Sequence, residues 1–171
     1  MKEVVGTTGK VLEIDLSHSA IREFLITPQE RQQYIGGKGL GLYYLSQRLS
    51  PGIDPVSPEN PLILMMGPLL GTNAPCSGRF DAVTKSPLTG IVVSSSCGGP
   101  FGMALKTAGY EGLILTGQAV APTTLLITPE GVSLQDAAAL WGQPSRAAQA
   151  SLQLGKQDGA LVIGPAGENL V

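Results

Sequence analysis

The order of apolar and polar residues near the start of the chain predicts a β-hairpin followed by two helices. Residues 9–16 (GKVLEIDL) and 20–26 (AIREFLI) alternate between apolar and polar side chains on either side of a short turn, as strands with one buried face do. Thr27-Pro28-Gln29-Glu30 has the pattern of a capping box with proline at the first helical position, which predicts a helix over residues 28–34. After an interruption by glycines, a second helix is expected over residues 40–49.

The rest of the chain predicts more strands than helices. Residues 62–66 (LILMM) form a continuous apolar run of strand length, which is typical of a strand buried on both faces. The same patterns predict helices over residues 101–108 and 145–154 and strands over residues 80–85, 90–95, 112–116, 123–128, 132–134 and 160–163. Hairpins and helices are mixed without a regular βαβ rhythm. The fold class is therefore predicted to be α+β, a single domain with mixed or antiparallel sheets and a few helices over residues 1–171.

Composition excludes several classes of protein. Hydrophobic residues make up 43% of the 171 positions and the net charge is −2, which excludes a disordered chain. The longest apolar run is far shorter than the roughly 20 residues of a membrane span, and no basic stretch followed by an apolar one opens the chain. A cytoplasmic protein without a membrane partner is expected. The acidic balance also argues against nucleic acid as a partner.

The low charge predicts that another molecule covers part of the surface. Only 14% of the residues are charged, and none is charged from Pro61 to Gly78. A surface of this kind is usually covered by a ligand, a further domain or another subunit, so the chain is expected to self-associate. Residues 164–169 (GPAGEN) resemble the approach to a site and are followed by only two residues. The domain is therefore expected to be truncated at its C-terminal end.

The cysteines, the histidine and the first glycine cluster offer little chemistry by themselves. Cys76 and Cys97 are the only thiols and are not spaced as metal ligands, so they are expected to be buried or site-lining residues rather than a zinc or iron–sulfur site. His18 is the sole histidine and should lie exposed in a turn. The glycines at 36–41 follow a predicted helix rather than a strand, which argues against a dinucleotide loop. Either a tight helix–helix corner or a close backbone approach to a ligand would explain them.

Residues 67–99 carry the candidate chemistry. Arg79, Lys85, the serines 94–96 and several glycines fall at predicted strand ends, and Asp81 is the only carboxylate in the segment. Exposed backbone amides beside glycine, with an arginine and a lysine nearby, are typical of an anion-binding surface. A glycine-rich turn region that merely folds tightly would have the same composition. The two readings remain balanced on composition alone.

Several sequence blocks resemble the aldehyde ferredoxin oxidoreductase family, and they cover only its N-terminal domain. They occur in the family's order and at its spacing, and weaker similarity reaches back to residue 9. The blocks are GPLLGTNAP at 67–75, GRF at 78–80, TKSPLTG at 84–90, GGPFG at 98–102, LKTAGYE at 105–111, ALWG at 139–142 and IGPAGENLV at 163–171.

The resemblance implies part of a tungsten or molybdenum enzyme that oxidises aldehydes to carboxylic acids and passes the electrons to ferredoxin. In the family, two pyranopterins joined through magnesium hold the metal. The family's pterin-contacting arginine falls on Arg79, and its Asn-Ser-Gly segment falls on Ser96, Cys97 and Gly98. Ser96 replaces the asparagine, so only a backbone contact to magnesium would survive there. Lys85 completes the expected cofactor-binding set.

The same resemblance implies what this chain would lack. The four cysteines of the family's [4Fe–4S] cluster and its substrate channel would lie beyond position 171, so the chain would hold no catalytic residue and be an enzyme only as part of a larger protein. Those further domains, or a complementary subunit, would be its partners. The alternatives are a stand-alone, non-catalytic scaffold and a fragment that binds a phosphate-bearing ligand. Neither the aldehyde nor the choice between tungsten and molybdenum is implied.

Overall fold

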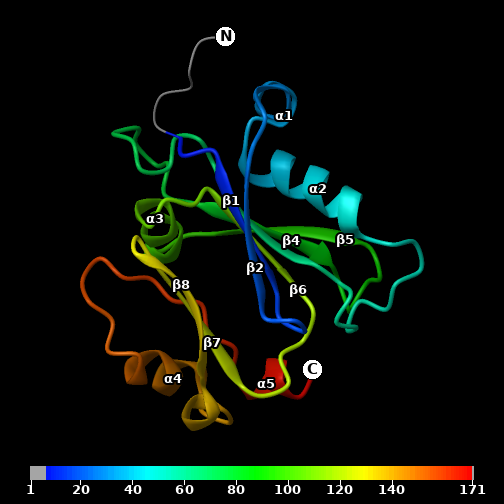
Figure 1. Cartoon of the computed structure of the whole chain (residues 1–171), viewed down its shortest axis with the longest axis vertical. Coiled ribbons are helices and arrows are strands. Elements are labelled where there is room, and N and C mark those ends of the chain that lie inside the picture. The colour runs from blue at the N-terminus through cyan, green and yellow to red at the C-terminus, as the bar shows by residue number, and fades with distance from the viewer. Residues whose placement is uncertain (1–6, 171) are drawn as a thin grey trace.

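A computed structural model describes residues 7–170, which form a six-stranded mixed sheet covered on both faces (Figure 1). Most elements lie within one or two residues of their predicted positions. In chain order they are β1 (Lys10–Asp15), β2 (Ala20–Leu25), α1 (Pro28–Tyr34), α2 (Gly37–Arg48), β3 (Leu62–Met66), β4 (Phe80–Lys85), β5 (Val92–Cys97), α3 (Pro100–Thr107), β6 (Gly112–Thr116), β7 (Thr123–Thr128), β8 (Gly131–Asp136), a 3₁₀ turn (Ala138–Leu140), α4 (Ser145–Ser151) and α5 (Pro165–Glu168).

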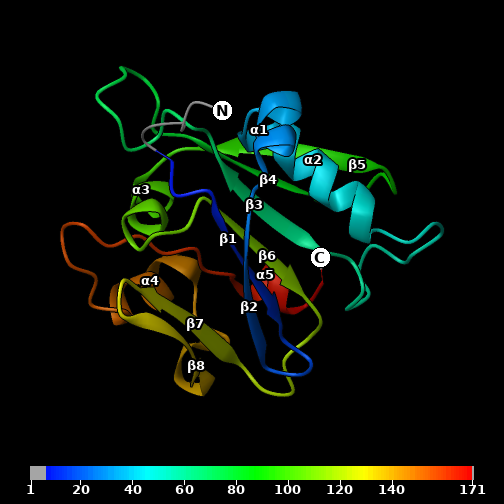
Figure 2. The same cartoon turned by 45° about the horizontal axis from the view of Figure 1, so that its top comes forward.

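The sheet confirms the predicted α+β class. Its strand order is β2-β1-β6-β3-β4-β5, in which β1 and β6 are parallel and all other neighbours are antiparallel. Strands β7 and β8 form a separate hairpin. Helices α1 and α2 lie over one face of the sheet, and α3 lies on the other with the β7–β8 hairpin (Figure 2). None of the helices within residues 7–170 combines the length and the apolar composition needed to cross a bilayer.

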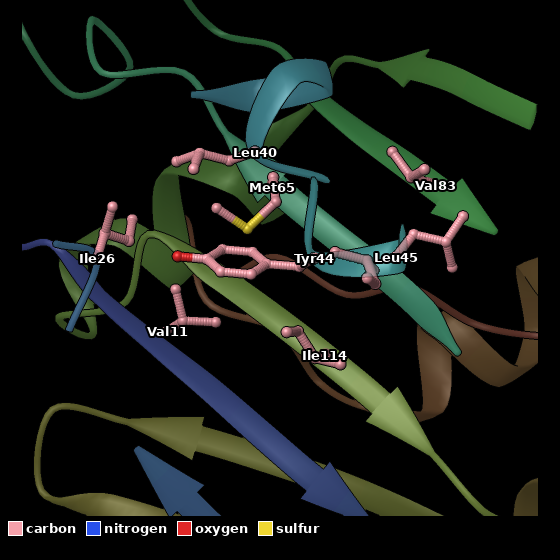
Figure 3. Packing of buried hydrophobic residues seen from close by; sticks show 9 residues of the cluster. Val11, Ile26, Leu40, Tyr44, Leu45, Met65, Val83 and Ile114 are labelled. Carbon is pink, nitrogen blue, oxygen red and sulfur yellow. The ribbon is translucent and has the colours of Figure 1, made fainter. Parts of the chain in front are cut away.

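Burial on both faces of the central strands produces two apolar cores. On β3, Ile63 and Met65 point toward α2, whereas Leu64 and Met66 point toward α3. The alternation explains why β3 is a continuous apolar run, as predicted. The Tyr44 ring of α2 lies at the centre of the first core (Figure 3). The members of that core are Val11, Ile26, Leu40, Tyr44, Leu45, Ile63, Met65, Val83 and Ile114.

The corner between α1 and α2 explains the first glycine cluster. The capping box is present as predicted, with the Thr27 hydroxyl accepting from the Glu30 amide at 3.2 Å and the Glu30 carboxylate accepting from the Thr27 amide at 2.7 Å. Helix α2 begins at Gly37, three residues earlier than expected. A Cβ on Gly39 would lie 2.3 Å from the Tyr34 carbonyl oxygen. Of the two readings left open, the structure shows the tight helix–helix corner.

Two predicted strands need correction. Residues 86–91 form a longer turn than expected, closed by hydrogen bonds from the Ser86 amide to Ile91 O and from the Gly90 amide to Ser86 O, so β5 starts at Val92 rather than at residue 90. Residues 160–163 are not a strand. Their apolar run resembles a buried strand, but the run has no place in either described sheet and Ile163 is 61% exposed. A strand requires a ladder partner as well as an apolar pattern.

Smaller differences concern element ends. Helix α4 ends at Ser151 rather than at residue 154, and β8 is longer than predicted at both ends. His18 lies exposed in the first hairpin turn, as expected, where its ring lies 2.7 Å from the Asp15 carboxylate. Residues 1–6 and Val171, which belong to the expected domain and to its last sequence block, lie outside the described residues.

The helix corner yields a stability prediction. We expect Gly39→Ala to lower the free energy of unfolding by about 1–3 kcal/mol, because the new methyl group would clash with a backbone carbonyl that cannot move without breaking the corner. Helix propensity alone would act in the opposite direction, since alanine is favoured over glycine by about 1 kcal/mol. Urea unfolding of the wild type and the variant measures the difference.

A matched control is Gly131→Ala at the start of β8. A Cβ at Gly131 would meet nothing within 4 Å, so this variant should change the free energy of unfolding by less than about 0.5 kcal/mol. Equal stability of Gly39→Ala and the wild type would contradict the close packing of the corner.

Candidate functional site

Three neighbouring strands bring the predicted site residues together at one end of the sheet. Met66 of β3 pairs with Phe80 of β4, and Phe80 pairs with Cys97 of β5. The next residues outward on these three strands are Gly67, Arg79 and Gly98. These residues therefore leave the sheet side by side, although they are far apart in the sequence.

Arg79 is held against β5 by two hydrogen bonds. Its Nε donates to Ser96 Oγ at 3.1 Å, and its Nη2 donates to the Ser96 carbonyl at 3.1 Å. Arg79 is otherwise exposed to solvent. The guanidinium is thus oriented by the strand but stays accessible, as a planar donor for an anionic ligand requires.

Strand β5 presents a polar, uncharged edge beside this arginine. It is the last strand of the sheet, and none of its six residues is buried. Ser94, Ser95 and Ser96 contribute three hydroxyls, followed by the exposed thiol of Cys97. An edge strand also leaves backbone N–H and C=O groups without a strand partner on its outer side. The edge therefore offers both donors and acceptors to a ligand.

The start of helix α3 adds backbone donors to the same end of the sheet. Gly99 caps the helix without a side-chain hydrogen bond, Pro100 occupies the first turn, and that turn contains no acidic residue. The positive end of the helix dipole and its unpaired N–H groups favour an anion there. The sequence predicted a helix over residues 101–108, and proline is common at the first helical position, but the predicted anion-binding surface did not include the start of this helix.

The glycines of the site leave its backbone open to approach. A Cβ built on Gly78, Gly98 or Gly99 would meet nothing within 4 Å, in contrast to the crowded glycines of the helix corner. Gly99 also has a φ of +99°, which other residues rarely adopt. The backbone at these three glycines therefore faces open space. The three glycines are therefore not part of a tightly packed turn, and they leave the backbone accessible to a ligand.

The single carboxylate of the segment is engaged elsewhere. Asp81 Oδ2 accepts a hydrogen bond from the Lys38 amide at 3.2 Å and so caps the N-terminus of α2 from the neighbouring strand. The contact joins residues 43 positions apart, so no local sequence pattern could reveal it. The negative charge of Asp81 thus lies at the positive end of the α2 dipole, which stabilises it there.

Lys85 lies away from the other predicted site residues. It is the last residue of β4, at the opposite end of this strand from Arg79, and it pairs with Val92, the first residue of β5. Its ammonium donates to the Ile53 carbonyl at 2.5 Å and so ties the loop of residues 49–61 to the sheet. The structure therefore brings together Arg79, Ser96, Cys97 and Gly98 but not Lys85, and the proposed cofactor contact of Lys85 gains no geometric support.

The Ser96 carbonyl is a poor cation ligand in this arrangement. It already accepts a hydrogen bond from the positively charged Arg79, and that charge repels a metal ion at the same oxygen. Among residues 7–170, no group of three or more histidine, cysteine or acidic side chains could hold a metal ion. A magnesium contact at Ser96 therefore requires the guanidinium to turn toward the ligand.

A family model described as "Aldehyde ferredoxin oxidoreductase, N-terminal domain" matches residues 11–171. The chain is 38% identical to a tungsten-containing aldehyde ferredoxin oxidoreductase of Pyrococcus furiosus and 40% identical to one of Pyrococcus horikoshii. Each match covers 97% of this chain but 28% of the relative, so the chain spans little more than a quarter of their length.

A solved structure shares the fold. It is the active-site complex of a benzoyl coenzyme A reductase bound to 1,5-dienoyl-CoA, and it superposes with a TM-score of 0.84 at 34% sequence identity. The superposition covers 86% of this chain and 23% of that chain.

The exposure of both cysteines leads to a direct test of the site. Cys76 and Cys97 are free and exposed, rather than buried, so two thiols per chain should react rapidly with an aromatic disulfide reagent in the absence of denaturant. Cys76→Ser and Cys97→Ser should each remove one reactive thiol, which assigns the two signals. A thiol that reacts only after unfolding would contradict the exposed positions of the loop and the edge strand.

Proposed function

The chain belongs to the aldehyde ferredoxin oxidoreductase family, and on that premise we propose that it forms the surface that binds the family's tungsten or molybdenum bis-pyranopterin cofactor. The oriented, solvent-accessible guanidinium of Arg79 is the observation that carries the proposal. Arg79 lies where the edge of β5, the start of α3 and an open glycine backbone converge. This combination suits phosphate and other anionic groups of a pterin cofactor.

The relatives support a cofactor surface rather than a substrate pocket. The two Pyrococcus enzymes are named as aldehyde ferredoxin oxidoreductases, whereas the solved relative is a benzoyl coenzyme A reductase bound to 1,5-dienoyl-CoA. The region shared with this chain is thus common to proteins that act on different substrates. A shared region of this kind is expected to bind what the proteins have in common and to leave substrate choice to the rest of each molecule.

Each residue of the site has a limited role in this proposal. Arg79 donates charge-assisted hydrogen bonds and Ser96 orients the guanidinium. Gly98 allows close backbone approach, and the exposed Cys97 lies directly before it. Ser96 contacts magnesium through its carbonyl only when Arg79 has turned toward the cofactor. When bound, the cofactor supplies the redox chemistry that removes two electrons from an aldehyde. This chain's residues bind and orient, and none of them is proposed as catalytic.

The larger protein supplies what this chain does not. We expect further domains or a complementary subunit to carry the [4Fe–4S] cluster, the substrate channel and the contact to ferredoxin, in a cytoplasmic enzyme. Exposed apolar residues such as Leu88 and Ile91 at the tip of the β4–β5 hairpin are expected to be covered there, and to cause self-association when they are not. The alternative is a non-catalytic domain that binds a phosphate-bearing ligand at the same arginine.

The proposal is tested by the cofactor content of the assembled protein. Expressed together with the complementary family domains, the chain should carry tungsten or molybdenum and an extractable pterin, measured by metal analysis and by fluorescence of the oxidised pterin. The complementary domains expressed alone serve as the control and should retain less of both. A folded complex that contains neither metal nor pterin would reject the proposal and favour the non-catalytic alternative.

The role of Arg79 is tested separately. Arg79→Ala should weaken cofactor retention about tenfold or more, since hydrogen bonds to charged groups contribute about 1.5–3 kcal/mol each. Arg79→Lys should restore it only in part, because an ammonium lacks the planar fork of donors. Retention is measured as metal that stays bound during dialysis.

The matched control for Arg79 is Arg22→Ala. Arg22 is exposed on β2, at the opposite edge of the sheet, and should leave retention unchanged. Equal cofactor retention in Arg79→Ala and the wild type would remove Arg79 from the site.

A further inference from the structure

Lys106 is a lysine buried in α3 on the side of the helix that faces the loop after β3. Its side chain is only 8% exposed, and its Nζ donates to two backbone carbonyls, Pro68 O at 3.1 Å and Gly67 O at 3.3 Å. Burial lowers the pKa of this ammonium. A buried charge is costly unless it is paired and hydrogen-bonded, so its partners indicate what it stabilises.

A buried carboxylate explains how the ammonium is tolerated. Glu111 has no exposed surface; its Oε2 accepts from Arg31 Nη2 at 2.5 Å and from the Gly9 amide at 3.1 Å, while Oε1 has no hydrogen-bond partner among residues 7–170. The Glu111 carboxylate favours the charged form of Lys106, whereas burial and the nearby charge of Arg31 both lower the pKa of Lys106. Lys106 therefore has an electrostatic partner, while its hydrogen bonds go to the loop.

The two carbonyls lie at the start of the loop of residues 67–79, next to Arg79. Gly67 follows Met66, and Met66 pairs with Phe80, the residue after Arg79. Beyond this point the loop is held by short-range bonds such as Leu70 N to Gly67 O at 3.2 Å and Thr72 N to Leu69 O at 3.1 Å. A Cβ added to Gly71 would lie 3.5 Å from Cδ of Lys106, so the aliphatic part of the lysine packs close to the loop backbone at Gly71.

We propose that Lys106 is a positioning residue. Its ammonium fixes the first turn of the 67–79 loop and so determines where the loop backbone lies beside Arg79. The ammonium of Lys106 donates to backbone carbonyls of the loop, so Lys106 acts through the loop backbone. The part of the proposal that concerns loop order stands on the contacts above, whereas its consequence for cofactor binding rests on the proposed function. The two parts are tested by different measurements.

Hydrogen exchange of the purified chain tests the loop. Lys106→Met keeps the length of the stem and removes the charge and the donors, so amides of residues 67–79 should exchange at least about tenfold faster, because hydrogen bonds to charged groups are the stronger class. Peptides from β1 and β6 should keep their wild-type rates. Lys156→Met, a change at an exposed lysine in another part of the chain, is the matched control and should alter neither region.

A second variant covers the case in which Lys106→Met does not fold. Lys106→Gln keeps an uncharged hydrogen-bond donor. The amides of residues 67–79 should therefore exchange faster than in the wild type but by less than the tenfold expected for Lys106→Met. Unchanged exchange of residues 67–79 in a folded variant would overturn the proposal. Equally fast exchange in β1, β6 and the loop would also overturn it, because it would show a general structural role.

Cofactor content in the assembled protein tests the consequence for binding. Lys106→Met should lower metal and pterin content together with the protection of the loop. A loosened loop with unchanged cofactor content would reject the role in cofactor placement while the role in loop order stands. A wild-type assembly without metal or pterin would instead reject the proposed function, and the exchange data would still decide whether Lys106 orders the loop.

Discussion

A sheet that is buried on both faces can offer polar groups to a ligand only at its strand ends and edges. Strands β3 and β6 lie at the centre of the six-stranded sheet and carry apolar side chains into both cores. Their interiors therefore have no room for a charged ligand. The proposed binding groups occur where β3, β4 and β5 end together and along β5, the edge strand next to Arg79. The position of the proposed site therefore follows from where the buried part of the sheet ends.

The buried charges connect the elements that surround this end of the sheet. Glu111 lies just before β6, its partner Arg31 comes from α1, and Lys106 comes from α3 and binds the loop after β3. A buried ion pair adds little net stability by itself, because desolvation offsets most of the attraction. Its geometric effect is larger, since an unpaired charge in this place would be strongly unfavourable. The cluster therefore specifies how α1, α3 and the loop are placed, more than it strengthens the fold.

Local signals made much of the fold predictable, and contacts between distant residues account for what could not be predicted. The capping box at Thr27, the two-sided apolar run of β3 and the first hairpin each depend on neighbouring residues, and each was correctly predicted. The prediction of a strand over residues 160–163 was wrong, because this segment has the composition of a strand but no ladder partner in the described sheets. For the site, resemblance led to Arg79 and Ser96, whose side chains meet across 17 positions. Lys85 was grouped with them by composition. Composition does not show that Lys85 and Arg79 lie at opposite ends of the same strand.

The lack of charge along β5 is consistent with the proposal that a cofactor and further domains cover this surface. Exposed edge strands are normally protected by lysine, proline or a bulge against pairing with other chains. Here no residue from Ser86 to Leu105 is charged, and Leu88, Ile91 and Val92 are exposed beside the serines of the edge. An acidic side chain would protect the edge, but it would also compete with an anionic ligand for Arg79. On the proposed function, the chain meets both demands by keeping the edge uncharged and leaving its protection to the cofactor and the domains that enclose it.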